Sequence, residues 1–185
     1  MRPLRELDRS LPLTLAKPSW KRGLHELRAG TEVVGTLDVN SWSGGSVAAA
    51  AEGGWRFERP RGFLRRSVRI LGAGDVELGR FASSGFGGRG GTLRLGERVY
   101  ELRTREVFKP RFAWTDGSGE LAAFTASGGL GERKGAFELT AAGRASADAA
   151  LLLLLGAHLA LLSQRETAAI GGASAAAAGA AAAGS

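Results

Sequence analysis

The stretch Ala149–Leu162, with the sequence AALLLLLGAHLALL, decides the fold of this chain. Leu151–Leu155 are consecutive leucines, so a helix here presents apolar side chains in every direction. Asp148 or Ser146 can cap its N-terminus, and the polar run Gln164–Glu166 follows it. The pattern predicts one helix over residues 147–165, which must be surrounded by protein or by lipid.

The length of this predicted helix favours burial in protein over insertion in lipid. Fourteen helical residues span about 21 Å, whereas the hydrocarbon core of a bilayer is about 30 Å thick. The small residues Gly156, Ala157 and Ala160 also suit close packing against other elements. We therefore expect a buried helix and keep a membrane anchor as the alternative. The residues expected to form its core contacts are Leu151, Leu152, Leu154, Leu155, His158, Leu159 and Leu162.

The sequence before this helix is strand-like. Short runs of alternating apolar and polar residues recur, separated by glycine-containing turns, and no segment between them has the pattern of a crossover helix. We therefore expect an antiparallel sheet. The predicted strands are Leu24–Arg28, Glu32–Val39, Ser46–Ala51, Trp55–Glu58, Leu64–Leu71, Val76–Phe81, Thr92–Leu95, Arg98–Leu102, Arg111–Thr115, Glu120–Thr125 and Ala136–Thr140.

A sheet of this size avoids exposed edges by closing into a barrel, whose interior is too wide for its own side chains to fill. The predicted fold class is thus all-β, a closed antiparallel barrel of about 11–12 strands enclosing the hydrophobic C-terminal helix. Residues 1–19 are expected to be a proline-marked lead-in, residues 20–166 the barrel with its helix, and residues 167–185 a disordered alanine and glycine tail.

The order of these pieces resembles the tubby-like C-terminal barrel superfamily, which includes LURP-one-related proteins and phospholipid scramblases. The matching pieces span about residues 20–165. They are Gly35-Thr-Leu, Gly54-Trp-Arg-Phe, Gly79-Arg-Phe, the hairpin Gly91-Thr-Leu-Arg-Leu-Gly96…Tyr100-Glu-Leu, the hairpin Phe112-Ala-Trp114…Gly119-Glu-Leu, and the helix Asp148–Leu162.

The resemblance implies phosphoinositide binding, membrane association or no known activity, since members of the superfamily differ in this respect. It carries over no catalytic residue. The paired basic residues of the tubby phosphoinositide site, the calcium-binding segment of scramblases and their cysteine- and proline-rich preface have no counterpart in this sequence. Lipid scrambling is therefore not inferred.

Basic residues are in excess, with 25 Lys and Arg against 18 Asp and Glu and a formal net charge of +7. They cluster at Arg56, Arg59, Arg61, Arg65, Arg66 and Arg69. Strand alternation places Arg65 and Arg69 on the outward face, where they can meet phosphates. We predict Arg61, Arg65 and Arg69 as anion-binding residues. A solvated, arginine-rich wall that reflects coding bias is the alternative, and nucleic acid is disfavoured.

Motifs of catalysis and cofactor binding are weak. Gly85–Gly90 matches G-x-G-x-x-G, but a strand rather than a helix follows it, so we expect a hairpin loop. Asp116–Glu120 lacks the spacing of a calcium loop and reads as a turn. His25 and His158 have no neighbours that indicate a triad or a metal site, and cysteine is absent. We predict no catalytic residue, metal or cofactor.

The expected function is therefore a non-enzymatic binding or scaffolding module for anionic phospholipid headgroups or a membrane surface. The alternatives are a protein-interaction module, and a small-ligand carrier that uses the barrel interior near His158 and Arg66. The first twenty residues lack a secretory signal pattern. We expect a cytoplasmic monomer, peripheral to the membrane where it binds lipid.

Overall fold

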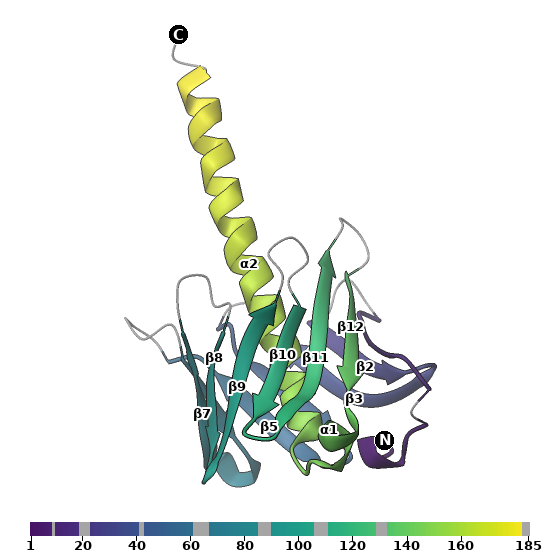
Figure 1. Ribbon diagram of the computed structural model, residues 1–185. Helices are drawn as coiled ribbons and strands as arrows, with labels where there is room; N and C mark the ends of the chain where they lie inside the picture. The colour runs from purple at the N-terminus through teal and green to yellow at the C-terminus, as the bar shows by residue number, and fades with distance from the viewer. Residues whose placement is uncertain are drawn as a thin grey trace.

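The computed structural model describes residues 1–8, 10–18, 23–40, 43–60, 67–84, 90–105, 111–128 and 133–182. Twelve antiparallel strands form a closed barrel, and each pairs with the next strand in sequence. The helix α2 (Ala149–Ala182) begins inside the barrel and leaves through one end (Figure 1). The predicted fold class is confirmed.

The predicted strands correspond to β2 through β12, except that residues 64–66 of the predicted strand Leu64–Leu71 lie outside the described residues. Glycines with positive φ, including Gly74 and Gly96, lie in the connecting turns. Two short 3-10 helices, η1 (Leu4–Glu6) and η2 (Ala73–Asp75), and the helix α1 (Ala141–Ala145) complete the described elements. The strands are β1 (Leu13–Ala16), β2 (Leu24–Ala29), β3 (Glu32–Val39), β4 (Ser46–Ala50), β5 (Gly53–Glu58), β6 (Ser67–Leu71), β7 (Glu77–Ser83), β8 (Gly91–Leu95), β9 (Arg98–Arg105), β10 (Arg111–Asp116), β11 (Gly119–Gly128) and β12 (Arg133–Leu139).

The strand that closes the barrel lies in the segment predicted as a lead-in, so that prediction is wrong for residues 13–16. β1 pairs with β2 on one side and with β12 on the other. Leu13 and Leu15 point into the core and are buried. The four residues of β1, Leu13–Ala16, give too short an alternation to identify a strand, and pairing with β2 and with the distant β12 stabilises it.

The first half of α2 fills the barrel as predicted. It begins at Ala149, and the Leu152 amide donates to the Asp148 carbonyl at 2.9 Å. Of the seven predicted core residues, Leu159 is partly buried and packs against the core, and the other six are buried. A Cβ on Gly156 would lie 2.6 Å from Cε1 of Phe124, so only glycine allows β11 to approach the helix this closely.

Beyond the barrel, α2 continues to Ala182, although residues 167–185 were expected to be a disordered tail. Alanine has the highest helix propensity, and adding residues to an existing helix avoids the cost of nucleation. Figure 1 shows this part, in yellow, projecting away from the strands. Within the described residues, no helix is both long and apolar enough to cross a membrane.

The short helix α1 was not predicted. Thr140 caps it, since its hydroxyl accepts a hydrogen bond of 3.0 Å from the Gly143 amide. A Cβ on Gly143 would lie 1.9 Å from the Leu121 carbonyl oxygen, so the helix rests directly on the β11 backbone. In Figure 1, α1 lies at the end of the barrel opposite the one through which α2 leaves.

Candidate functional site

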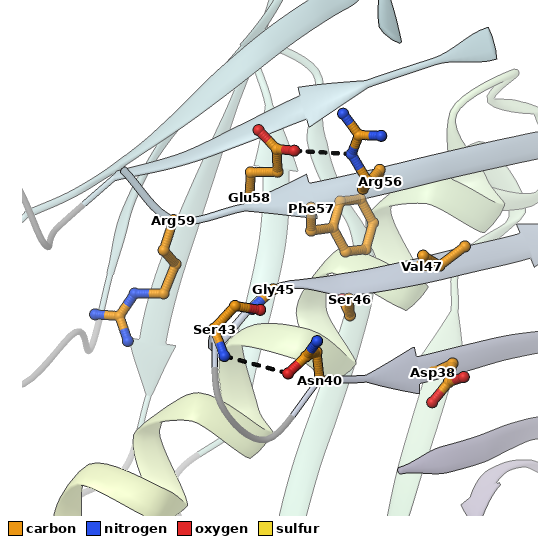
Figure 2. A pocket seen from close by; sticks show the side chains of 10 residues that line it. All are labelled: Asp38, Asn40, Ser43, Gly45, Ser46, Val47, Arg56, Phe57, Glu58 and Arg59. Atoms are coloured by element: carbon orange, nitrogen blue, oxygen red, sulfur yellow. Dashed lines mark hydrogen bonds and ion pairs between the residues drawn. The ribbon is translucent and has the colours of Figure 1, made fainter. Parts of the chain in front are cut away.

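A pocket of about 530 Å³ lies where β3, β4 and β5 reach the rim of the barrel (Figure 2). Its volume falls within the range of small-molecule sites, about 300 to 1,000 Å³. Because side chains alternate along each strand, some of the lining residues form an outer wall and others an inner wall of the pocket. The loop between β3 and β4 lies at the rim. Its lining residues are Asp38, Asn40, Ser43, Gly45, Ser46, Val47, Arg56, Phe57, Glu58 and Arg59.

The inner wall joins the barrel to the helix. Ser46 Oγ lies 2.9 Å from His158 Nδ1, and both residues are buried. The Phe57 ring packs at 5.4 Å between centroids from the His158 ring. Because these residues come from β4, β5 and α2, they fix the position of the helix beneath the pocket.

His158 stays neutral at physiological pH. Burial, followed by repulsion from Arg59 and Arg165, lowers its pKa to about 3. Within the described part of the chain, its Nε2 atom is buried without a hydrogen-bond partner. A general base works best when its pKa lies near the operating pH, so this imidazole is a poor base for activating Ser46. Ser46 and His158 therefore anchor the helix. They are the residue types of a nucleophile and its general base, but the low pKa of His158 does not suit that role.

The rim loop is held by its own hydrogen bonds. The Ser43 amide donates to Asn40 Oδ1 at 3.2 Å, and the Gly45 amide donates to Ser43 Oγ at 3.2 Å. Arg59 lies across Gly44, where a Cβ would be 3.5 Å from Arg59 Cδ. Arg59, Ser43 and Asn40 all line this pocket, and guanidinium, hydroxyl and amide groups are donors that phosphate or carboxylate oxygens can accept from.

The outer wall carries a network of alternating charges. Arg56 pairs with Glu58 at 2.8 Å and with Asp75 at 2.7 Å. Arg69 pairs with Glu77 at 2.9 Å and reaches Glu58 at 3.8 Å. Since each guanidinium contacts two carboxylates, much of the positive charge of Arg56 and Arg69 is compensated within the barrel wall.

Of the three residues predicted to bind anions, only Arg69 lies within the described residues. Arg69 faces outward as alternation predicts, in the charge network, whereas Arg61 and Arg65 lie outside the described residues. Arg59, which belongs to the same basic cluster but is not among the three predicted anion-binding residues, lines the pocket. The signal that could have identified it is its position directly after β5, at the rim.

Other predicted features have structural roles. His25 is buried, its Nδ1 lies 2.9 Å from the Gly23 carbonyl oxygen, and burial lowers its pKa. Asp116 Oδ1 accepts from the Ser118 amide at 2.8 Å and holds the predicted turn between β10 and β11. Most of Gly85–Gly90 lies outside the described residues, between β7 and β8. Among the described residues, no three potential metal ligands lie together.

A second anchor holds the start of α2. Tyr100 donates a hydrogen bond of 2.5 Å to Asp148 Oδ2, and Arg98 forms an ion pair of 2.6 Å with the same oxygen. Burial and this hydrogen bond raise the pKa of Tyr100 to about 12. No local pattern indicates this contact, because Tyr100 and Asp148 are 48 positions apart.

Comparisons with protein-family models, curated proteins and solved structures produced no match to this chain. The resemblance to tubby-like barrels therefore stays a prediction.

Proposed function

We propose that this barrel is a non-enzymatic binding module that takes the phosphate of a phospholipid headgroup in the pocket at its rim. The observation that carries the proposal is that Arg59 lines the pocket together with Ser43 and Asn40 (Figure 2). Arginine binds phosphate oxygens through several N–H donors at once. Its positive charge also acts at this place, since it contributes to the lowered pKa of His158.

Two further features support this function. The net charge of +7 attracts the chain to anionic membrane surfaces over a range set by ionic strength. The barrel axis is occupied by α2, whose buried leucines pack against the inward side chains of the strands. We therefore favour a site at the rim over the alternative of a ligand carried inside the barrel.

Vesicle binding tests the proposal. The protein is titrated with vesicles of phosphatidylcholine alone and with vesicles that also contain phosphatidylglycerol, at low and at moderate salt. Arg59→Glu is compared with Arg103→Glu, which makes the same charge change at a wall residue whose partner is Glu101. Both variants are first checked by thermal unfolding.

We expect binding that requires the anionic lipid and is reduced at least about tenfold by Arg59→Glu, the equivalent of one charge-assisted hydrogen bond. Arg103→Glu should weaken it much less. Equal losses in the two variants would mean that binding is a diffuse effect of net charge. No binding to either vesicle would contradict the proposal.

A second candidate is a protein-interaction module, which the outer wall between β7 and β9 favours. Leu78 and Val99 are exposed to 40% and 42%, and Arg80 and Arg94 lie directly opposite each other on β7 and β8. Arg94 makes no ion pair with another described residue. A peptide of glutamate and leucine should bind here and be weakened by Arg94→Gln, whereas a peptide that binds both forms equally would exclude this surface.

A further inference from the structure

Three exposed apolar side chains lie on one side of the barrel wall. Val76, directly before β7, is 60% exposed, Leu78 in β7 is 40% exposed and Val99 in β9 is 42% exposed. The other large apolar side chains that are exposed among the described residues, Met1 and Val47, belong to different parts of the chain. Figure 1 shows β7, β8 and β9 next to one another. We name as the β7–β9 patch the residues Val76, Leu78, Arg80, Arg94, Glu97 and Val99.

Strand register brings this patch together on the outer face. Arg94 of β8 lies directly opposite Arg80 of β7 and Val99 of β9. Leu93 and Leu95, which flank Arg94 in the strand, are buried, so Arg94 points outward. The apolar side chains of β7 and β9 therefore lie on either side of an outward guanidinium.

Leu78 is held at the surface by a β-bulge. Ile70 of β6 pairs with Gly79, and Leu71 pairs with Glu77, so Leu78 is the extra residue without a partner on β6. A Cβ on Gly72 would lie 2.9 Å from Leu78 Cδ1, which shows that Leu78 covers the start of the connection between β6 and β7. Single apolar residues are ordinary at a surface, whereas a group of them is typical of an interaction site.

Two charges in the patch are uncompensated, and they have opposite sign. Arg80 pairs with Glu77 at 3.1 Å. Arg94 and Glu97 are exposed, and neither makes a hydrogen bond or an ion pair with another described residue. Both belong to the hairpin of β8 and β9, in which Glu97 lies in the turn. The patch therefore offers one cation and one anion a few residues apart.

This pair of charges identifies the kind of partner that fits. In an interface with two-fold symmetry the same patch occurs on both sides, so each charge must be matched by an opposite charge of that patch. Arg94 and Glu97 meet this requirement. The closed barrel has no free strand edge, so a second barrel can pack here only through outward side chains.

We propose that the β7–β9 patch binds the same patch of a second copy of this chain across a two-fold axis. Arg94 of each copy meets Glu97 of the other, and Leu78 and Val99 are covered in the contact. The inference rests on the second candidate function, because it names the partner of that surface. It is independent of the headgroup pocket, and it replaces the monomer expected from the sequence.

Sedimentation equilibrium of the full chain over a range of concentrations tests this dimer. We expect a reversible equilibrium between monomer and dimer. Val99→Lys should raise the dissociation constant at least about tenfold, because it places a charge in the apolar part of the contact. Val47→Lys is the matched control, since Val47 is also an exposed strand valine but lies on β4. It should leave the constant unchanged.

Charge reversal tests the pairing itself. Arg94→Glu places two acids opposite each other in the dimer, and Glu97→Arg places two bases opposite each other, so each variant alone should associate at least about tenfold more weakly. A mixture of the two variants restores both opposite-charge pairs and should form a dimer of one copy of each. Thermal unfolding confirms that every variant is folded.

The outcomes separate this inference from the function on which it rests. A dimer that tolerates Val99→Lys, or reversal variants that do not associate on mixing, would overturn the proposed contact. A chain that stays monomeric would overturn the dimer, and the peptide of glutamate and leucine then tests the surface. Peptide binding that is weakened by Arg94→Gln would retain the surface for another protein, whereas no peptide binding would overturn the interaction module as well.

Discussion

Ser46 of β4 and His158 of α2 share a buried hydrogen bond of 2.9 Å between Oγ and Nδ1, which joins the barrel wall to the helix at its axis. The two residues are 112 positions apart, so the contact exists only when the barrel has closed around the helix. It lies directly beneath the rim pocket, because Ser46 also lines that pocket. The stability of the enclosed helix and the shape of the pocket therefore depend on the same pair.

Removing the serine hydroxyl should destabilise the fold. Ser46→Ala leaves His158 Nδ1 buried without its partner, which costs about 1–3 kcal/mol in the free energy of unfolding. Ser43→Ala is the matched control, because the Ser43 hydroxyl bonds an exposed loop amide. Urea denaturation measures both. Equal, small losses would show that the Ser46 to His158 bond does not hold the helix.

The protein should lose stability as the pH falls below about 6.5. Unfolded histidine takes up a proton near that pH, whereas buried His158 stays neutral down to about 3, so unfolding binds a proton across this interval. His158 alone should lower the free energy of unfolding by about 1.4 kcal/mol for each pH unit below this value. His25, whose pKa is also lowered by burial, adds a slope of the same sign.

His158→Asn isolates the contribution of His158, because its amide can still bond Ser46 but does not titrate. Urea denaturation between about pH 6.5 and 5 lies above the range in which most carboxylates protonate. The free energy of unfolding of the variant should fall less steeply with decreasing pH, by about 1.4 kcal/mol per pH unit. Identical slopes in the variant and the original protein would contradict a buried, neutral His158.

The substitution Gly156→Ala should raise the helix propensity of α2 but crowd its packing against β11. Alanine is favoured over glycine within a helix by about 1 kcal/mol. The added Cβ would lie 2.6 Å from the Phe124 ring, which is itself stacked on Phe112 and Phe137 at 5.0 and 5.8 Å and cannot easily move. We expect a net loss of about 1–3 kcal/mol.

Gly117→Ala is the control for this substitution, because a Cβ at that turn position would meet no atom within 4 Å. Its effect on the denaturation midpoint should be small, within about 0.5 kcal/mol. A stabilising effect of Gly156→Ala would show that α2 is not packed against β11 as closely as the structure places it.

Tyr100 is the chain's only tyrosine, so its ionisation can be followed directly by ultraviolet absorbance. The folded protein should form phenolate near pH 12, and the protein unfolded in urea near pH 10. Because the folded pKa is raised, the contribution of Tyr100 to stability is present below pH 10 and is lost as the pH rises towards 12. Ionisation near 10 in the folded state would contradict the buried bond to Asp148.

Local patterns were sufficient to predict β2 through β12 and the start of α2, because each depends on alternation, turn glycines or a leucine run within a few residues. β1 was not predictable in this way, since its four residues become a strand only through pairing with β2 and β12. α2 extends beyond its predicted end because the low-complexity alanine tract has a high helix propensity and continues an existing helix.

The site was harder to predict than the fold. The basic cluster indicated the correct region, but the sequence could not show that Arg69 pairs with Glu77 or that Arg59 lies in the pocket. Nor could it show that Asp38 lines the same pocket as Arg59, since only the pairing of β3, β4 and β5 brings these residues to one site. Contacts across strands, rather than motifs along the chain, define this site.

The central claim is that the barrel encloses the leucine-rich half of α2, and cysteine labelling tests it most directly. The chain has no cysteine, so Ala157→Cys introduces a single thiol at a position that is 1% exposed. Ala142→Cys places the same thiol on the exposed face of α1. We predict that a maleimide labels Cys at 142 at once but labels Cys at 157 only after unfolding, with or without vesicles. Equally rapid labelling of both thiols in the native protein would contradict an enclosed helix.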